Sequence, residues 1–222
     1  MSPNQKIVAR GGWLPVKTFC RFCEIHKSTG DLQQQDRPFL RTNDNFAIPT
    51  IGGLVEGWSL LCPGDHIFSL REKYGQPSFS DFVRNVVTRV TTRYVRPVIF
   101  EHGSSHAGSL TSCGTDHAHL HIVPLGFSLH GALRDSGRSW TLVRSSDISS
   151  LVKSAEYLFY SEDVLSEDPE GLIHVLEQPT SQFFRRLIAT ILGREAESDY
   201  RQHPLIAHAV KTQQFLADTD RV

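Results

Sequence analysis

The sequence predicts an α+β fold with the element order strand, strand, helix, strand, strand, followed by a second segment of strands and helices. Two observations support this prediction. Short apolar runs occur around Leu60, Val98 and Leu120, and runs of this kind are typical of β-strands. Between the first two runs, apolar residues recur at helical spacing from Phe79 to Tyr94 and form one stripe.

Composition limits the class of protein. A chain of 222 residues, 39% hydrophobic and 21% charged, can form one well-packed globular domain with an appendage. The net charge of −1 argues against bulk nucleic-acid binding, which needs a basic surface. No run of about 18 apolar residues predicts a membrane span. Residues 1–12 lack the apolar core of a signal peptide, so we expect a cytoplasmic protein whose cysteines stay reduced.

The elements expected in the first 127 residues follow in order. Residues 1–17 should form an irregular N-terminal arm, and residues 18–127 the first structural unit. Glycines between residues 51 and 57 indicate a turn. We expect a cysteine-containing segment at 18–26, a polar loop at 30–44, strands at 45–48 and 58–63, a helix from the N-cap Ser80 to Tyr94, a strand at 95–100, a loop at 101–113, and a strand that begins at His117.

The C-terminal segment, residues 128–222, has an α+β pattern of its own and should pack on the first unit as an extension. Gly193 indicates the end of one of its helices. We expect a helix capped by Asp147 that runs to Tyr157, strands at 158–160 and 172–177, a helix at 182–192, and a last helix at 204–216.

Three histidines alternate with apolar residues in the run His117-Ala-His119-Leu-His121. Successive side chains of a β-strand point to opposite faces, so the three imidazoles should share one face and the apolar residues the other. Histidine suits nucleophilic and acid–base chemistry near pH 7. The alternative interpretation is a solvated strand face or a simple metal patch.

A second motif points to a metal. Cys20 and Cys23 form a C-x-x-C pair, which suits zinc, although a redox pair or two free thiols have the same spacing. Tetrahedral zinc needs two more ligands, and His66 after the Pro63 turn and His117 at the start of the triad can supply them. Four protein ligands would make the zinc site structural, not catalytic.

These motifs resemble the histidine triad (HIT) superfamily. Residues 117–123 match its signature of three histidines alternating with apolar residues. Residues 57–66 look like the family's glycine–strand–proline–turn–histidine segment, and the Cys20–Cys23 pair looks like the zinc-binding N-terminus of many bacterial members. The loop at 100–117 is similar to that of galactose-1-phosphate uridylyltransferase, a distant relative on the same fold.

The resemblance covers residues 18–127 and implies an antiparallel five-stranded sheet with a packed helix, extended here by further chain. It implies structural zinc on the same four residues and chemistry at the α-phosphate of a nucleotide. His119 would be the nucleophile that forms a covalent nucleotidyl-histidine, with its Nδ1 proton held by a backbone carbonyl. His121 would hydrogen-bond the phosphoryl oxygens. Backbone around Ser112, Gly114 and Thr115 would also contact the substrate.

The resemblance also bears on the reaction. Transferase relatives carry glutamine at the third triad position, whereas hydrolase branches keep histidine, so His121 favours hydrolysis. The substrate would be a nucleotide conjugate: a phosphoramidate, a dinucleoside polyphosphate or a sugar nucleotide. One alternative is a nucleotidyltransferase or phosphorylase, which the loop at 100–117 favours; another is a non-catalytic module that binds nucleotides or RNA ends. Small relatives are usually homodimers. A homodimer is a possible partner state here too, unless the extension occupies the face through which the relatives dimerise.

Three positions depart from the family's pattern. Thr50 stands where many members have an acidic residue that binds the ribose hydroxyls, and a threonine cannot chelate a diol. Gly64 replaces a frequent lysine, and Gly114 replaces a serine that lies near the leaving group in small hydrolases. Glu101 and His106 are the candidates for protonating a leaving group.

Two arginines of the extension are further candidates for the substrate site. The segment from Gln182 to Arg186 is faintly similar to a C-terminal segment of splicing-factor-like HIT proteins. Arg185 and Arg186 could clamp a phosphate, because a guanidinium matches phosphate geometry. The alternative is an ordinary helix with a solvated basic edge.

Overall fold

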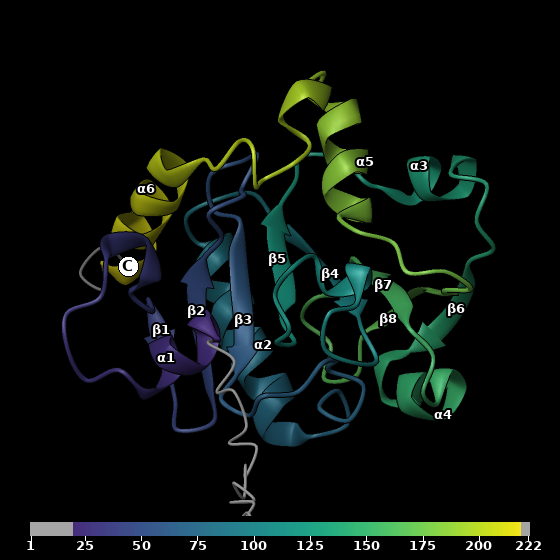
Figure 1. Cartoon of the computed structure of the whole chain (residues 1–222), viewed down its shortest axis with the longest axis horizontal. Helices are drawn as coiled ribbons and strands as arrows, with labels where there is room; N and C mark the ends of the chain where they lie inside the picture. The colour runs from purple at the N-terminus through teal and green to yellow at the C-terminus, as the bar shows by residue number, and fades with distance from the viewer. Residues whose placement is uncertain (1–19, 219–222) are drawn as a thin grey trace, which may run out of the picture.

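The computed structural model describes residues 20–218 and contains a single antiparallel sheet of eight strands with helices on both faces (Figure 1). The strand order is β1-β2-β3-β5-β4-β7-β8-β6. The strands are β1 (Leu40–Arg41), β2 (Asn45–Pro49), β3 (Ser59–Pro63), β4 (Pro97–Gly103), β5 (Leu120–Pro124), β6 (Thr141–Arg144), β7 (Tyr157–Ser161) and β8 (Glu170–Val175). The α-helices are α1 (Arg21–Lys27), α2 (Pro77–Thr91), α3 (His130–Asp135), α4 (Ile148–Val152), α5 (Phe183–Ile191) and α6 (Ile206–Ala217). The N-terminal arm expected at 1–17 lies outside the described residues.

The α+β class is confirmed, but the sheet is larger than the expected five strands. Strands β1 to β5 come from the first unit, and β7 then hydrogen-bonds along the open edge of β4 with Ile99 opposite Ser161 and Gly103 opposite Tyr157. An open strand edge carries unpaired N–H and C=O groups, which β7 satisfies. Periodicity within one segment carries no information about which edges will pair. The segment after residue 127 therefore contributes three strands to the same sheet.

Alternating side chains place two apolar layers on the two faces of the sheet. On one face, Leu120 and Ile122 pack against the apolar stripe of α2, as the helical spacing predicts. On the other face, Phe100 and Val123 pack against Phe184 of α5. Helix α1 packs on this second face over β2 and β3. A cavity lies on that face, lined by residues of both α1 and α5.

Several element boundaries differ from the expected ones. Helix α2 begins at Pro77, three residues before Ser80, because proline is favoured in the first turn of a helix. The helix expected to reach Tyr157 is short, since Lys153 has a positive φ of 51° and ends it. The cysteine pair starts a helix, and the regular strand of the triad begins only at Leu120. The elements β1, α3 and β6 were not predicted.

No helix within residues 20–218 combines the length and the apolar character needed to cross a bilayer.

The contribution of the C-terminal strands to the core can be tested with two leucines. Leu158 of β7 has no exposed surface, whereas Leu142 of β6 is 62% exposed. We expect Leu158→Ala to lower the free energy of unfolding by about 2–5 kcal/mol, because it opens a cavity between β7, β4 and α5. Leu142→Ala should change it by less than about 0.5 kcal/mol. Urea unfolding followed by tryptophan fluorescence and by far-UV dichroism measures both, and equal effects would contradict the packing.

Candidate active site and metal centre

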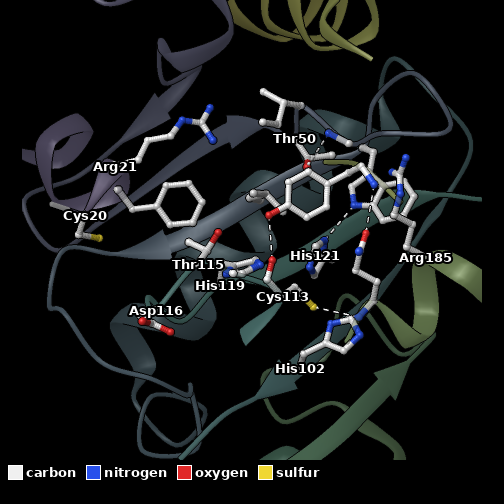
Figure 2. Close-up of a pocket in the computed structure, with 18 of the residues that line it drawn as sticks. Cys20, Arg21, Thr50, His102, Cys113, Thr115, Asp116, His119, His121 and Arg185 are labelled. Atoms are coloured by element: carbon white, nitrogen blue, oxygen red, sulfur yellow. Dashed lines mark hydrogen bonds between the residues drawn. The ribbon is translucent and has the colours of Figure 1, made fainter. Parts of the chain in front are cut away.

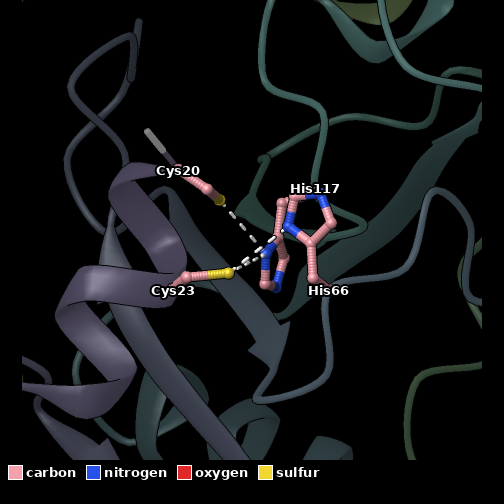
Figure 3. Close-up of side chains that lie close together, drawn as sticks. All are labelled: Cys20, Cys23, His66 and His117. Atoms are coloured by element: carbon pink, nitrogen blue, oxygen red, sulfur yellow. Dashed lines mark hydrogen bonds between the residues drawn. The ribbon is translucent and has the colours of Figure 1, made fainter. Parts of the chain in front are cut away.

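Four predicted metal ligands meet at one point (Figure 3). Cys20 and Cys23 lie at the start of α1, His66 follows the turn after β3, and His117 precedes β5. Their ligand atoms all lie within 4.8 Å of one another. The Sγ of Cys20 is 3.5 Å from Nδ1 of His117. The Sγ of Cys23 is 3.3 Å from Nδ1 of His66 and 3.6 Å from Nδ1 of His117. These residues could therefore bind a metal ion.

The spacing fits a tetrahedral ion. Bonds of about 2.3 Å to sulfur and about 2.0 Å to nitrogen at a tetrahedral angle place the two ligand atoms roughly 3.5 Å apart. The three sulfur–nitrogen distances lie close to that value. The Nε2 of His117 is 2.8 Å from the carbonyl oxygen of Pro63, and because a carbonyl can only accept, Nε2 carries the proton. The lone pair of Nδ1 is then directed at the two cysteines.

Protons and a metal ion compete for the cysteine sulfurs. Burial, and then the neighbouring Cys20, raises the pKa of the Cys23 thiol to about 11. Burial lowers the pKa of the His117 imidazole to about 4, so that ring stays neutral near pH 7. In the absence of a metal Cys23 is therefore a thiol, and a bound cation would displace its proton.

A cavity of about 420 Å³ lies beside this cluster on the same face of the sheet (Figure 2). Its floor carries His119 and His121, and its walls come from α1, the β2–β3 turn, the 113–116 loop and α5. A volume of this size is in the range of small-molecule sites. The alternation predicted for the triad holds, since the apolar residues between the histidines belong to the core under α2. His117 differs from the other two, because its ring belongs to the metal cluster.

His119 has one tautomer fixed by the backbone. Its Nδ1 lies 2.8 Å from the carbonyl oxygen of His117, and that oxygen can only accept, so Nδ1 carries the proton. Burial lowers the pKa of the ring below its ordinary value, which keeps it neutral. The lone pair is therefore on Nε2, the nitrogen that is not bonded to the backbone.

His121 has the opposite tautomer. The indole Nε1–H of Trp58 donates to its Nδ1 at 3.0 Å, so that nitrogen is the acceptor and Nε2 carries the proton. Phe100 stacks on the ring with centroids 4.5 Å apart. Burial, followed by the neighbouring His119 and His102, holds the pKa of His121 well below its usual range. The rings of His119 and His121 are 4.8 Å apart, one offering a lone pair and the other a proton.

The predicted substrate-binding residues divide into two groups. Gly114, Thr115, Thr50 and Arg185 line the cavity. Ser112 does not line it, because its hydroxyl is buried under the loop and donates to the carbonyl of Ser109 and to Asp116.

The two predicted arginines differ in the same way. Arg186 is exposed and lies outside the cavity lining, whereas Arg185 is only 5% exposed. Arg185 donates through Nε to the carbonyl of Ser198 and through Nη2 to that of Glu197. Its Nη1 has no hydrogen-bond partner among residues 20–218. Burial lowers the pKa of its guanidinium to about 10, so it still carries its charge near pH 7.

The two candidates for protonating a leaving group, Glu101 and His106, do not line the cavity. Glu101 is buried on the other face of the sheet, where it accepts hydrogen bonds from Tyr74 and Tyr157. The loop expected at 101–113 begins with three more residues of β4, and this places Glu101 in the strand. His106 is exposed and does not line the cavity.

Sequence reasoning missed several residues of the cavity. His102 lines it from β4, and both of its ring nitrogens are buried without a partner in the described part of the chain. Tyr200 and Asp116 also line it. Alternation from Phe100 along β4 could have placed His102 on the cavity face, if β4 had been predicted to extend past residue 100. No local pattern marks Tyr200.

A comparison with protein-family models finds no match, and no curated protein sequence is significantly similar to the chain.

Metal content tests the cluster. We expect about one equivalent of metal in the purified protein, and less than half an equivalent in Cys23→Ser, which removes a thiolate ligand. Cys62→Ala is the matched control, because Cys62 is buried in the core beneath α1 and is no member of the cluster. A strong chelator should lower the Tm of the wild type and the control by about 5 °C or more, and leave that of Cys23→Ser nearly unchanged. Full metal content in Cys23→Ser would contradict the assignment.

Metal binding should also release protons. Because the pKa of Cys23 is about 11 without metal, we expect at least one proton to leave per ion bound at pH 7.5. The apparent affinity should consequently fall as the pH is lowered. Calorimetric titration of the metal-free protein in two buffers of different ionisation enthalpy measures the number of protons. A value of zero would mean that the sulfur is not a ligand.

Proposed function

We propose that this protein is a hydrolase of the HIT type that cleaves a nucleotide conjugate at the α-phosphate. The observation that carries the proposal is the pair of fixed, opposite tautomers of His119 and His121 in one cavity. A neutral imidazole with a free Nε2 is a nucleophile for phosphorus. A neighbouring N–H donor suits the phosphoryl oxygens, where charge develops in the transition state.

The reaction would proceed in two displacements. The Nε2 lone pair of His119 forms a bond to the α-phosphorus, and the bond to the leaving group breaks with its electron pair going to that group. The proton on Nδ1 stays against the His117 carbonyl, which stabilises the positive charge of the substituted ring. Water then attacks phosphorus, the P–N bond breaks, the electron pair returns to Nε2, and the water's proton goes to solvent. Histidine at position 121, where the transferase relatives have glutamine, favours water as the acceptor.

The metal would be zinc in a structural role. Two cysteine sulfurs and two imidazole nitrogens are a ligand set that suits Zn²⁺, and four protein ligands leave no open position for substrate. Zinc would hold α1 against the strand of the triad. Phe22 of α1 contacts the rings of His117 and His119 with centroids 5.6 Å from each, so the position of α1 bears directly on the nucleophile.

The cavity suits a nucleotide. Aromatic and apolar side chains such as Phe22, Trp58 and Leu60 line it and can pack against a base. Thr50 is also in the lining, but its hydroxyl already accepts a hydrogen bond from the backbone of Gly52 at 3.3 Å. A single hydroxyl in this state binds a ribose diol less firmly than the carboxylate that many family members have.

The decisive test is a product screen with His119→Ala. Nucleoside phosphoramidates, dinucleoside polyphosphates and sugar nucleotides are incubated with the protein, and released monophosphate and intact protein mass are recorded. We expect the wild type to release monophosphate from at least one class, and His119→Ala to be slower by more than about 10³-fold, since it lacks the nucleophile. His130→Ala, which changes an exposed histidine of α3, should retain full activity.

The other outcomes separate the alternatives. A stable nucleotidyl mass on the wild type without release would indicate a transferase that needs a different acceptor. Binding of nucleotide without any turnover would indicate a binding module. Full activity in His119→Ala would overturn the proposal.

A further inference from the structure

A short segment of the C-terminal region contributes Tyr200 to the lining of the cavity. Residues 198–201, here called the strap, connect the 3-10 turn after α5 to the segment before α6. Tyr200 donates its hydroxyl to the carbonyl oxygen of Cys113 at 2.8 Å, and its backbone N–H donates to Gln182 at 3.2 Å. The side-chain amide of Gln182 in turn donates to Asp199 at 3.0 Å. These bonds fix the strap to α5 on one side and to the 113–116 loop on the other.

The strap places one arginine over the loop that lines the cavity. The guanidinium of Arg201 lies so close to Gly114 that a Cβ at position 114 would collide with its Nη2. Gly114 has a φ of +83° and follows Cys113 with a φ of 56°, so two successive residues are left-handed and the loop turns its backbone toward the strap. Gly114 and Thr115 line the same cavity as His119. Arg201 therefore lies at the rim of that cavity.

The guanidinium of Arg201 is exposed and lies 5.9 Å from the centroid of the Tyr200 ring. Its charge helps to hold the pKa of the nearby Asp199 carboxyl below its usual value, but among residues 20–218 no ion pair joins the two side chains. Asp199, the carboxylate of the strap, accepts from Gln182 and from the backbone N–H of Arg201. Asp116, the one carboxylate among the described residues of the lining, accepts from Gly108 at 2.9 Å and from Ser112 at 3.0 Å.

A second cation strengthens the positive character of this region. Arg185 lines the cavity, and its two hydrogen bonds go to carbonyl oxygens of the segment leading into the strap, not to a carboxylate. Two guanidinium groups without an ion pair, beside a lining with one engaged carboxylate, favour an anionic ligand. A single α-phosphate over His119 and His121 does not account for a cation at the rim above Gly114.

We propose that Arg201 binds a second phosphate of the substrate, beyond the α-phosphate that His119 attacks. This inference rests on the proposed function and narrows its substrate class. The preferred substrate joins its α-phosphate through a P–O–P anhydride to at least one further phosphate, as in a dinucleoside polyphosphate. A phosphoramidate, whose α-phosphate carries an amine, has no group for Arg201 to bind.

The chemistry of the leaving group agrees with this assignment. When Nε2 of His119 bonds to phosphorus, the bridging P–O bond breaks and its electron pair stays on the leaving phosphate, which is stable as an anion and needs no proton. An amine would have to be protonated as it leaves. His121 cannot serve as a cationic acid in this geometry, because the N–H of Trp58 occupies the side of the ring where a second proton would sit. A guanidinium at the rim instead stabilises the charge that develops on the leaving phosphate.

The experiment compares two substrates that differ in the bond broken. Wild type, Arg201→Ala and the control Arg134→Ala are assayed with a dinucleoside tetraphosphate and with a nucleoside 5′-phosphoramidate, each in adenosine and uridine forms. Arg134 is an exposed arginine of α3, with 81% of its side chain accessible. Metal content and Tm are measured first for every variant.

We expect Arg201→Ala to lower kcat/KM for the tetraphosphate by about 10- to 100-fold, as loss of a charged hydrogen bond does. Cleavage of the phosphoramidate should change by less than about threefold, and Arg134→Ala should change neither. Arg201→Lys should restore part of the loss, since it returns the charge without the planar guanidinium. Equal losses on both substrates would show that Arg201 only supports the strap. No loss on either substrate would show that Arg201 does not contact the substrate. Either result would overturn the inference.

Failure of the proposed function is distinguishable from failure of this inference. If the wild type cleaves none of these compounds, calorimetry with adenosine and uridine mono- and diphosphates tests Arg201 by itself. We then expect Arg201→Ala to weaken diphosphate binding by about 10-fold or more and to leave monophosphate binding unchanged. Equal affinities of the wild type and Arg201→Ala for the diphosphates, or no binding of them by the wild type, would overturn the assignment of Arg201.

Discussion

The site depends on the two hydrogen bonds of one residue, His117. Its ring donates to the carbonyl of Pro63, which directs the other nitrogen at Cys20 and Cys23. Its own carbonyl accepts the Nδ1 proton of His119 and so leaves the Nε2 lone pair free. The candidate metal ligands and the candidate nucleophile are thus held by the ring and the backbone of the same residue.

Burial explains why each ring needs a fixed partner. A buried imidazole is held neutral, because its charged form loses hydration, and each of its nitrogens then has a single hydrogen-bonding role. Trp58, the residue before strand β3, fixes His121, and Phe100 covers that ring from β4. The aromatic layer beneath the cavity therefore excludes water and also sets which nitrogen of His121 carries the proton. This arrangement leaves a lone pair on His119 and an N–H group on His121 in the same cavity.

The segment after residue 127 completes both the sheet with its apolar layer and the wall of the cavity. Strand β7 covers the open edge of β4, and α5 closes the apolar layer that holds Phe100 and Val123. After α5 and the 3-10 turn that follows it, the strap reaches the cavity, where the hydroxyl of Tyr200 donates to the carbonyl of Cys113. The same segment that extends the sheet thus also supplies Arg185 and Arg201, which in our proposal set the charge of the ligand.

The sequence by itself determined the features that depend on local spacing. Alternation predicted the shared face of His119 and His121, the stripe from Phe79 predicted α2, and the chemistry of Cys20 and Cys23 predicted the metal cluster. Only the tertiary structure decided that β7 pairs with β4, that Arg185 lines the cavity while Arg186 faces solvent, and that His102 and Tyr200 join the site. The reason is physical: adjacent arginines on one helix are equivalent until a neighbouring element covers one of them, and segments from 100 to 200 meet only when the sheet closes over its core.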